Sequence, residues 1–215
     1  MTARRIALLG AESTGKTQLA ADLATHWRSR GRRVIVVDEV LREWCAREGR
    51  TPRPEEQEPI AREQERRVDE AAASGAEIVI ADTTAVMVAV YSAMLFADGS
   101  LLQFALQRQR TYHATLVTGL DLPWVADGLQ RDGPHVRPPV DAQVRELLAR
   151  GEVPYQVVYG NGPQRLAHAL RALGEADDLG DGGAALAACC ERCGDGTCER
   201  HLFTRLVGAR GGQGV

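Results

Sequence analysis

The sequence predicts an α/β fold in which a mostly parallel, five-stranded sheet lies between two layers of helices. Short apolar runs of strand length alternate along the chain with longer segments of helical periodicity. Such alternation is typical of a parallel sheet with helices on both faces, a three-layer sandwich. A glycine-rich motif directly follows the first apolar run, at the edge of the sheet where such folds bind ligands. The predicted strands are residues 6–9, 34–37, 78–81, 115–118 and 155–159.

The helices are predicted from the spacing of apolar residues and from the residues that end each segment. The first follows the glycine-rich motif through Leu19, Leu23 and Trp27, and it stops near Gly31. Further helices are predicted at 41–47, 55–73, 86–96, 101–110, 140–149 and from 163 to 173. Residues 121–139 are rich in Gly, Pro, Asp and Arg without a clear period, so we expect a lid loop there.

Length and composition suit one domain with an appendage. The chain has 215 residues, 44% of them hydrophobic, and a formal net charge of −3. This charge gives no reason to expect a nucleic-acid or membrane partner, and we see neither a signal peptide nor a membrane span. We therefore expect a cytoplasmic protein of open oligomeric state. Its P-loop domain would be 1–174, followed at 175–215 by a linker and a cysteine-rich tail.

Residues 10–17, GAESTGKT, fit the phosphate-binding P-loop pattern G-x-x-x-x-G-K-[ST]. Lys16 is the only lysine of the chain, and a compact ammonium reaches between the β- and γ-phosphates better than a planar guanidinium does. Thr17 is expected to place its hydroxyl on Mg²⁺. The predicted cofactors are therefore ATP or GTP, with Mg²⁺. The expected nucleotide contacts are Gly10, Glu12, Ser13, Thr14, Gly15, Lys16 and Thr17.

Acidic residues follow two other predicted strands at the same edge of the sheet. Asp82 ends the third strand and could hold Mg²⁺, or it could cap the next helix. Asp38 and Glu39 end the second strand, and one of them could be the base for an acceptor hydroxyl. A helix cap is again the alternative.

The lid segment and the last strand add cationic and aromatic candidates. Arg131 and Arg137 could bring positive charge to a migrating phosphoryl group, or they could be solvated surface charges. Trp124 could stack on a flat ring or anchor the lid as an apolar plug. Arg165 could contact a base or a phosphate, or it could be an ordinary charge on a helix surface.

Several segments together resemble one known family. They are the P-loop, 37–43 (VDEVLRE), Ile60-Ala61 with Gln64, 81–84 (ADTT) and 122–129 (LPWVADGL). In combination they resemble the kinase domain of NadR-type proteins, the ribosylnicotinamide kinases, over roughly residues 6–173. The resemblance implies a nucleoside-kinase-like P-loop NTPase. Its reaction would transfer the ATP γ-phosphate to the 5′-hydroxyl of nicotinamide riboside, yielding nicotinamide mononucleotide in NAD salvage.

The resemblance also implies roles for the residues on the phosphate and acceptor side. Lys16 and Thr17 would bind phosphate and magnesium, and Asp82 would lie beside the metal or the acceptor hydroxyl. Glu39 and Arg42 would face the riboside.

For the lid, the resemblance implies that Trp124 and Asp127 hold the nicotinamide ribose. The sequence departs from the family pattern in two places. Asp38 stands where the family has a proline, and Gln130 stands where it has an arginine, with Arg131 one position later. These departures bear on which acid is the base and on what the lid arginine does.

Four cysteines cluster near the C-terminus. Cys190-x2-Cys193 and Cys198-x2-His201 are two ligand pairs joined by a Gly-rich turn, and they could close a structural Cys₃His zinc site, with Cys189 as a substitute ligand. The alternatives are a redox-active CxxC pair or incidental thiols.

Two classes of function fit these observations. The leading hypothesis is a small-molecule kinase for nicotinamide riboside, with a kinase for another nucleoside as a close variant. The alternative is a nucleotide-dependent sensor or regulatory ATPase, whose hydrolysis of ATP would need no acceptor. The kinase requires Glu39 or Asp82 near an acceptor hydroxyl.

Overall fold

The computed structural model describes residues 2–125 and 133–175, and the five strands within these residues form one fully parallel sheet. The strand order is β2-β3-β1-β4-β5, which confirms the predicted α/β sandwich. β1 lies in the middle, so its carboxyl end is where the order of connections reverses, the place at which parallel sheets bind ligands. The strands are β1 (Arg4–Leu9), β2 (Val34–Val37), β3 (Ile78–Asp82), β4 (Ala114–Thr118) and β5 (Gln156–Val158).

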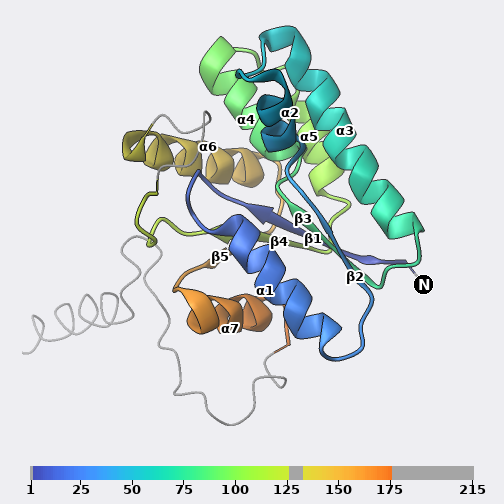
Figure 1. Cartoon of the computed structure of the whole chain (residues 1–215). Helices are drawn as coiled ribbons and strands as arrows, with labels where there is room; N and C mark the ends of the chain where they lie inside the picture. The colour runs from blue at the N-terminus through green and yellow to red at the C-terminus, as the bar shows by residue number, and fades with distance from the viewer. Residues whose placement is uncertain (1, 126–132, 176–215) are drawn as a thin grey trace, which may run out of the picture. The chain divides into compact units, whose positions relative to one another are not determined.

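The helices cover both faces of this sheet. α1 and α7 pack together on one face, and α3, α4, α5 and α6 lie on the other, with α2 beside α3 (Figure 1). The helices are α1 (Lys16–Arg28), α2 (Val40–Glu48), α3 (Pro54–Ala73), α4 (Ala85–Phe96), α5 (Leu102–Gln109), α6 (Arg137–Arg150) and α7 (Gly162–Ala172), and a short 3-10 turn, η2 (Pro134–Val136), precedes α6.

The burial of α4 explains the longest apolar segment of the chain. Residues 85–90 are all buried, and α3, α5 and α6 contact the helix from three sides. A helix that is apolar around its whole circumference is stable only when it is surrounded in this way. The helices on this face of the sheet therefore enclose a hydrophobic core, which also includes residues near the carboxyl ends of β1 and β4.

Several element boundaries differ from the prediction by a few residues, and the differences at α6 and β5 are examples. α6 begins at Arg137 rather than at Val140, because Pro138 and Pro139 fit the first turn of a helix, where no N–H donor is needed. β5 spans Gln156–Val158, so the predicted strand at 155–159 was too long at both ends.

In the described part of the chain, no helix combines the length and the apolar character that crossing a bilayer requires. The predicted cysteine-rich tail, with Cys190, Cys193, Cys198 and His201, lies outside the described residues. Cys45, on α2, is buried.

Candidate functional site

The P-loop connects β1 to α1 and has the backbone of a phosphate-binding loop. Gly10, Ser13 and Gly15 all have positive φ values, of 143°, 54° and 76°. Gly15 is the N-cap of α1, and no side chain caps that helix end. The first N–H groups of α1 therefore point out of the helix without a side-chain acceptor, as an anion-binding helix end requires.

Gly10 is required by close packing against β4. A Cβ atom at this position would lie 2.2 Å from Thr118 Oγ1. The Thr118 hydroxyl itself bonds the Thr14 hydroxyl at 2.7 Å and donates to Leu9 O at 3.1 Å. Thr14 also donates to Ala11 O, so a pair of threonine hydroxyls ties the P-loop to the neighbouring strand.

Lys16 is buried and folds back over the loop. Its Nζ donates to the carbonyl oxygens of Gly10 at 2.9 Å and Ala11 at 3.0 Å. Burial lowers the pKa of Lys16 from its ordinary value, while the negative charges of Glu39 and Asp82 oppose that shift. The Lys16 ammonium thus lies in the P-loop, where phosphate oxygens could replace the two carbonyl oxygens as its hydrogen-bond acceptors.

The candidate metal ligands meet at the carboxyl end of β3. Thr17 Oγ1 donates to Asp82 Oδ2 at 2.5 Å, and the other carboxylate oxygen of Asp82 is buried without a hydrogen-bond partner. Hydroxyl and carboxylate oxygens are the ligands that Mg²⁺ prefers, and phosphates and waters complete its coordination. The pair therefore fits Mg²⁺, although the described residues contain no group of three or more metal-ligating side chains.

Asp82 does not cap α4. The N-cap of that helix is Thr84, whose hydroxyl accepts from Val86 N at 3.2 Å. Between the two lies Thr83, which is buried, has φ = 88° and carries a hydroxyl without a hydrogen-bond partner. A β-branched residue with positive φ is strained, and such strain gathers at functional sites. Nothing in the sequence pattern signals this strain.

Glu39 and Arg42 link the end of β2 to the metal side. Arg42 Nη2 lies 2.9 Å from Glu39 Oε2, and Arg42 Nη1 donates to Thr17 Oγ1 at 3.2 Å. Glu39 is buried, whereas Asp38 is exposed. Of the two adjacent acids, Glu39 is therefore the one that faces inward. It occupies the N-cap position of α2, but its side chain makes no capping hydrogen bond.

Residues 122–125, the described start of the predicted lid, lie against the P-loop. Val125 N donates to Ser13 Oγ at 2.8 Å, and the Leu122 side chain packs close to Gly15. The indole N–H of Trp124 is buried and has no hydrogen-bond partner. Two predicted lid residues, Asp127 and Arg131, lie outside the described residues.

Arg137, at the start of α6, is buried behind this part of the lid. Its Nη1 donates to Leu122 O at 2.8 Å, while Nε and Nη2 are buried without partners. Burial lowers the pKa of Arg137, and Asp121 opposes the shift. A buried guanidinium with two unused donor atoms has the chemistry to bind an anion.

Arg165 is the buried tie between the P-loop and the loop after β4. Its Nη1 donates to Thr14 O, and its Nη2 forms an ion pair with Asp121 Oδ1 at 3.0 Å. Asp121 in turn accepts from Gly160 N. These contacts give Arg165 a structural task that the sequence did not signal, because Asp121 lies 44 residues away. Its predicted nucleotide contact stays a prediction.

Comparison with known proteins places this geometry in a family. Residues 5–165 match the sequence model described as an AAA domain. No curated protein matches the sequence.

Solved structures with the same fold include two NadR crystal structures. One, in complex with NR, has a TM-score of 0.66 and 20% identity over 81% of this chain and 52% of its own. The other, in complex with NAD and AMP-PNP, has a TM-score of 0.65 and 18% identity over 83% and 50%. The chain thus spans about half the length of these NadR chains. Thymidylate kinase from Ehrlichia chaffeensis has a TM-score of 0.52 and 13% identity, over 75% of this chain and 89% of its own. These likenesses show a P-loop kinase fold.

Replacing Gly10 with alanine should unfold the P-loop locally and weaken nucleotide binding. The new methyl group would meet the Thr118 hydroxyl, so we expect a loss of about 1–3 kcal/mol in the free energy of unfolding. We also expect at least a tenfold rise in the Kd for ATP. Gly31→Ala is the matched control, since Gly31 also has positive φ but nothing lies within 4 Å of a Cβ there. Urea unfolding and ATP titration of both variants measure the difference. Equal losses would show that the close approach to β4 is unimportant.

Proposed function

We propose that this chain, which belongs to the AAA domain family, is an ATP-dependent kinase for a small nucleoside, with nicotinamide riboside as its first candidate substrate. The observation that carries this proposal is the polar chain Glu39–Arg42–Thr17–Asp82. It joins a buried carboxylate, suited to an acceptor hydroxyl, to the pair suited to Mg²⁺. A nucleotide switch needs the pair suited to Mg²⁺, but it does not need a carboxylate for an acceptor hydroxyl.

The nucleotide side follows from the P-loop. Backbone N–H groups of residues 12–17 would hold the β- and γ-phosphates, and Lys16 would exchange its two carbonyl partners for phosphate oxygens. Thr17 and Asp82 would hold Mg²⁺, which would neutralise negative charge on the phosphates. Arg137 would turn its unused donors toward the migrating phosphoryl group.

The acceptor side follows from Glu39. An acceptor hydroxyl beside this carboxylate would give up its proton to Glu39 as its oxygen bonds to the γ-phosphorus. The bond between that phosphorus and the β–γ bridging oxygen breaks at the same time, and ADP leaves with the electron pair. Arg42 would keep Glu39 oriented toward the phosphate side.

The choice of nicotinamide riboside rests on the segments around 37–43 and 122–129, and on the shared fold with a NadR protein crystallised with NR. Trp124 supplies a flat apolar surface at the start of the lid together with an unused N–H donor, which suits an aromatic base.

The reaction is tested by product formation with Mg-ATP and a panel of nucleosides, nicotinamide riboside first, separated by chromatography beside an ATP-only control. We expect a mononucleotide that forms only with acceptor, and little ADP without it. Rapid ATP hydrolysis that ignores every acceptor would refute the kinase and favour a nucleotide-dependent switch.

Trp124→Ala should raise the KM for the riboside about tenfold or more and leave the KM for ATP within about twofold, because a stacking contact is lost only on the acceptor side. Trp124→Phe is the control, since it keeps the ring and loses only the N–H group. Steady-state kinetics with each substrate varied in turn give both constants. Equal changes in the two KM values would exclude the stacking role.

Arg137→Met should lower kcat about 100-fold or more while leaving the stability of the ligand-free protein unchanged or raised. The activity falls because charge on the migrating phosphoryl group loses a donor. The stability does not, because a buried guanidinium with two unpartnered donor atoms is replaced by an apolar side chain of similar length. Arg150→Met, at the exposed end of α6, is the control. Single-turnover kinetics and thermal unfolding measure the two effects, and a kcat within threefold of wild type would rule out the phosphate contact.

A further inference from the structure

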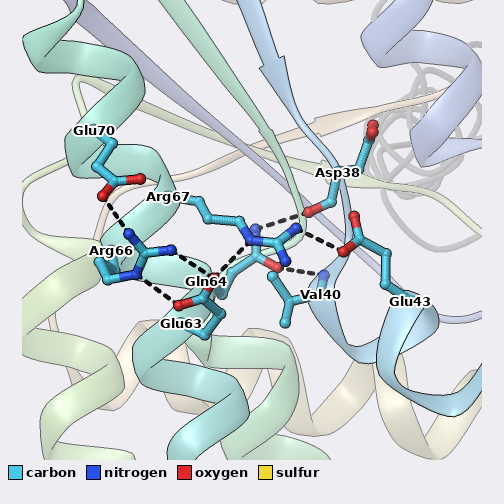
Figure 2. A network of polar contacts seen from close by, with 8 residues as sticks. All are labelled: Asp38, Val40, Glu43, Glu63, Gln64, Arg66, Arg67 and Glu70. Carbon is cyan, nitrogen blue, oxygen red and sulfur yellow. Dashed lines mark hydrogen bonds and ion pairs between the residues drawn. The ribbon is translucent and has the colours of Figure 1, made fainter. Parts of the chain in front are cut away.

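We propose that Gln64 is a positioning residue that holds Glu39 in place for the acceptor hydroxyl, an inference that rests on the proposed function. Gln64 lies on α3 and its side chain is 1% exposed. Its Oε1 accepts from Val40 N at 2.9 Å, and its Nε2 donates to Asp38 O at 3.3 Å (Figure 2). These two peptide groups lie on either side of Glu39. One amide therefore fixes the backbone before and after the candidate base.

A carboxamide suits this clamp because it carries both a donor and an acceptor. Both must come from one neutral, buried side chain, and Gln carries them on the same planar group. Gln64 also caps the N-terminus of α2. α2 begins at Val40 with no capping side chain of its own, so the amide of α3 supplies the acceptor for its first N–H group.

A second contact between the two helices is weaker. Arg67 Nη1 lies 2.7 Å from Glu43 Oε2, and its Nε lies 2.9 Å from Glu63 Oε1 (Figure 2). These side chains are between 33% and 47% exposed, and ion pairs of that exposure contribute little. The buried amide, not the exposed ion pairs, therefore sets the position of the β2–α2 turn.

The neighbouring residue on α3 makes the same kind of contact with the other acid-bearing strand end. Glu65 Oε1 accepts from Ala85 N at 2.9 Å, just after β3. Consecutive side chains of α3 thus hold the turn around Glu39 and the turn that follows Asp82. α3 thereby helps to set the distance between the two candidate site carboxylates, Glu39 and Asp82.

The test compares Gln64→Met, which keeps the length and loses both hydrogen bonds, with Gln64→Glu, which keeps the acceptor for Val40 N. Arg66→Ala is the matched control, because Arg66 is the next exposed arginine on the same helix and contacts only Glu63 and Glu70 among the residues drawn (Figure 2). Kinetics are run well below the unfolding temperature of each variant. Amide hydrogen exchange of residues 38–41 is followed in the same samples.

For Gln64→Met we expect a kcat about 100-fold below that of Arg66→Ala, with the KM for ATP within about twofold, because a displacement near 1 Å at the reacting groups has an effect of that order. The kcat of Gln64→Glu should be about tenfold higher than that of Gln64→Met. The amide of Val40 should exchange at least tenfold faster in Gln64→Met. A kcat within threefold of the control, or a KM for ATP that changes as much as kcat, would overturn the positioning role.

Failure of the proposed function would give a different result. In that case wild type itself forms no phosphorylated acceptor, whatever the state of residue 64. Hydrogen exchange then decides the inference alone: faster exchange confined to residues 38–41 in Gln64→Met supports the clamp, and unchanged exchange overturns it.

Discussion

The burial of one ammonium group organises this end of the molecule. Lys16 begins α1, directly after the loop that follows the central strand β1, and burial lowers its pKa. The negative charges that oppose this shift come from Glu39, after β2, and Asp82, at the end of β3. β3 is the direct neighbour of β1, and β2 is the next strand along. Because all strands run parallel, their carboxyl ends meet at one edge, and the charge balance follows from topology. An antiparallel arrangement would have sent one of these acids to the opposite end.

Several buried polar atoms without a hydrogen-bond partner lie around the P-loop. The described residues that carry them include Asp82, Thr83, Trp124 and Arg137, and each lies beside the P-loop or beside a segment that contacts it. Folded proteins pair nearly all of their buried polar groups, so a cluster of exceptions marks a place that a ligand completes. The charges of this set are complementary to a nucleotide with its metal: cationic donors for phosphate and a carboxylate oxygen for Mg²⁺. Ligand binding should therefore stabilise the folded state as well as start the reaction.

Much of the fold and part of the site could be predicted from the sequence. There is a physical reason why the remaining features could not. The strands, the P-loop and the acids that end β2 and β3 depend on patterns within a few residues, and such patterns are visible in a single sequence. The tie between Arg165 and Asp121 depends on a contact between residues 44 positions apart, and the clamp by Gln64 depends on contacts across 24 and 26 positions. The sequence also left open whether Asp82 holds Mg²⁺ or caps the next helix, and in the structure Thr84 is the N-cap of α4.

The two halves of the site are held by different means, and this has a consequence for specificity. The phosphate side is built from the P-loop backbone and is tied to β4 by the hydroxyls of Thr14 and Thr118. The acceptor side follows β2, a strand at the edge of the sheet, and is held by side chains of α3. A substitution on α3 can therefore move Glu39 without disturbing the P-loop. Acceptor preference can diverge among chains with this fold while the P-loop half stays constant, so a shared fold at 20% identity does not name the substrate.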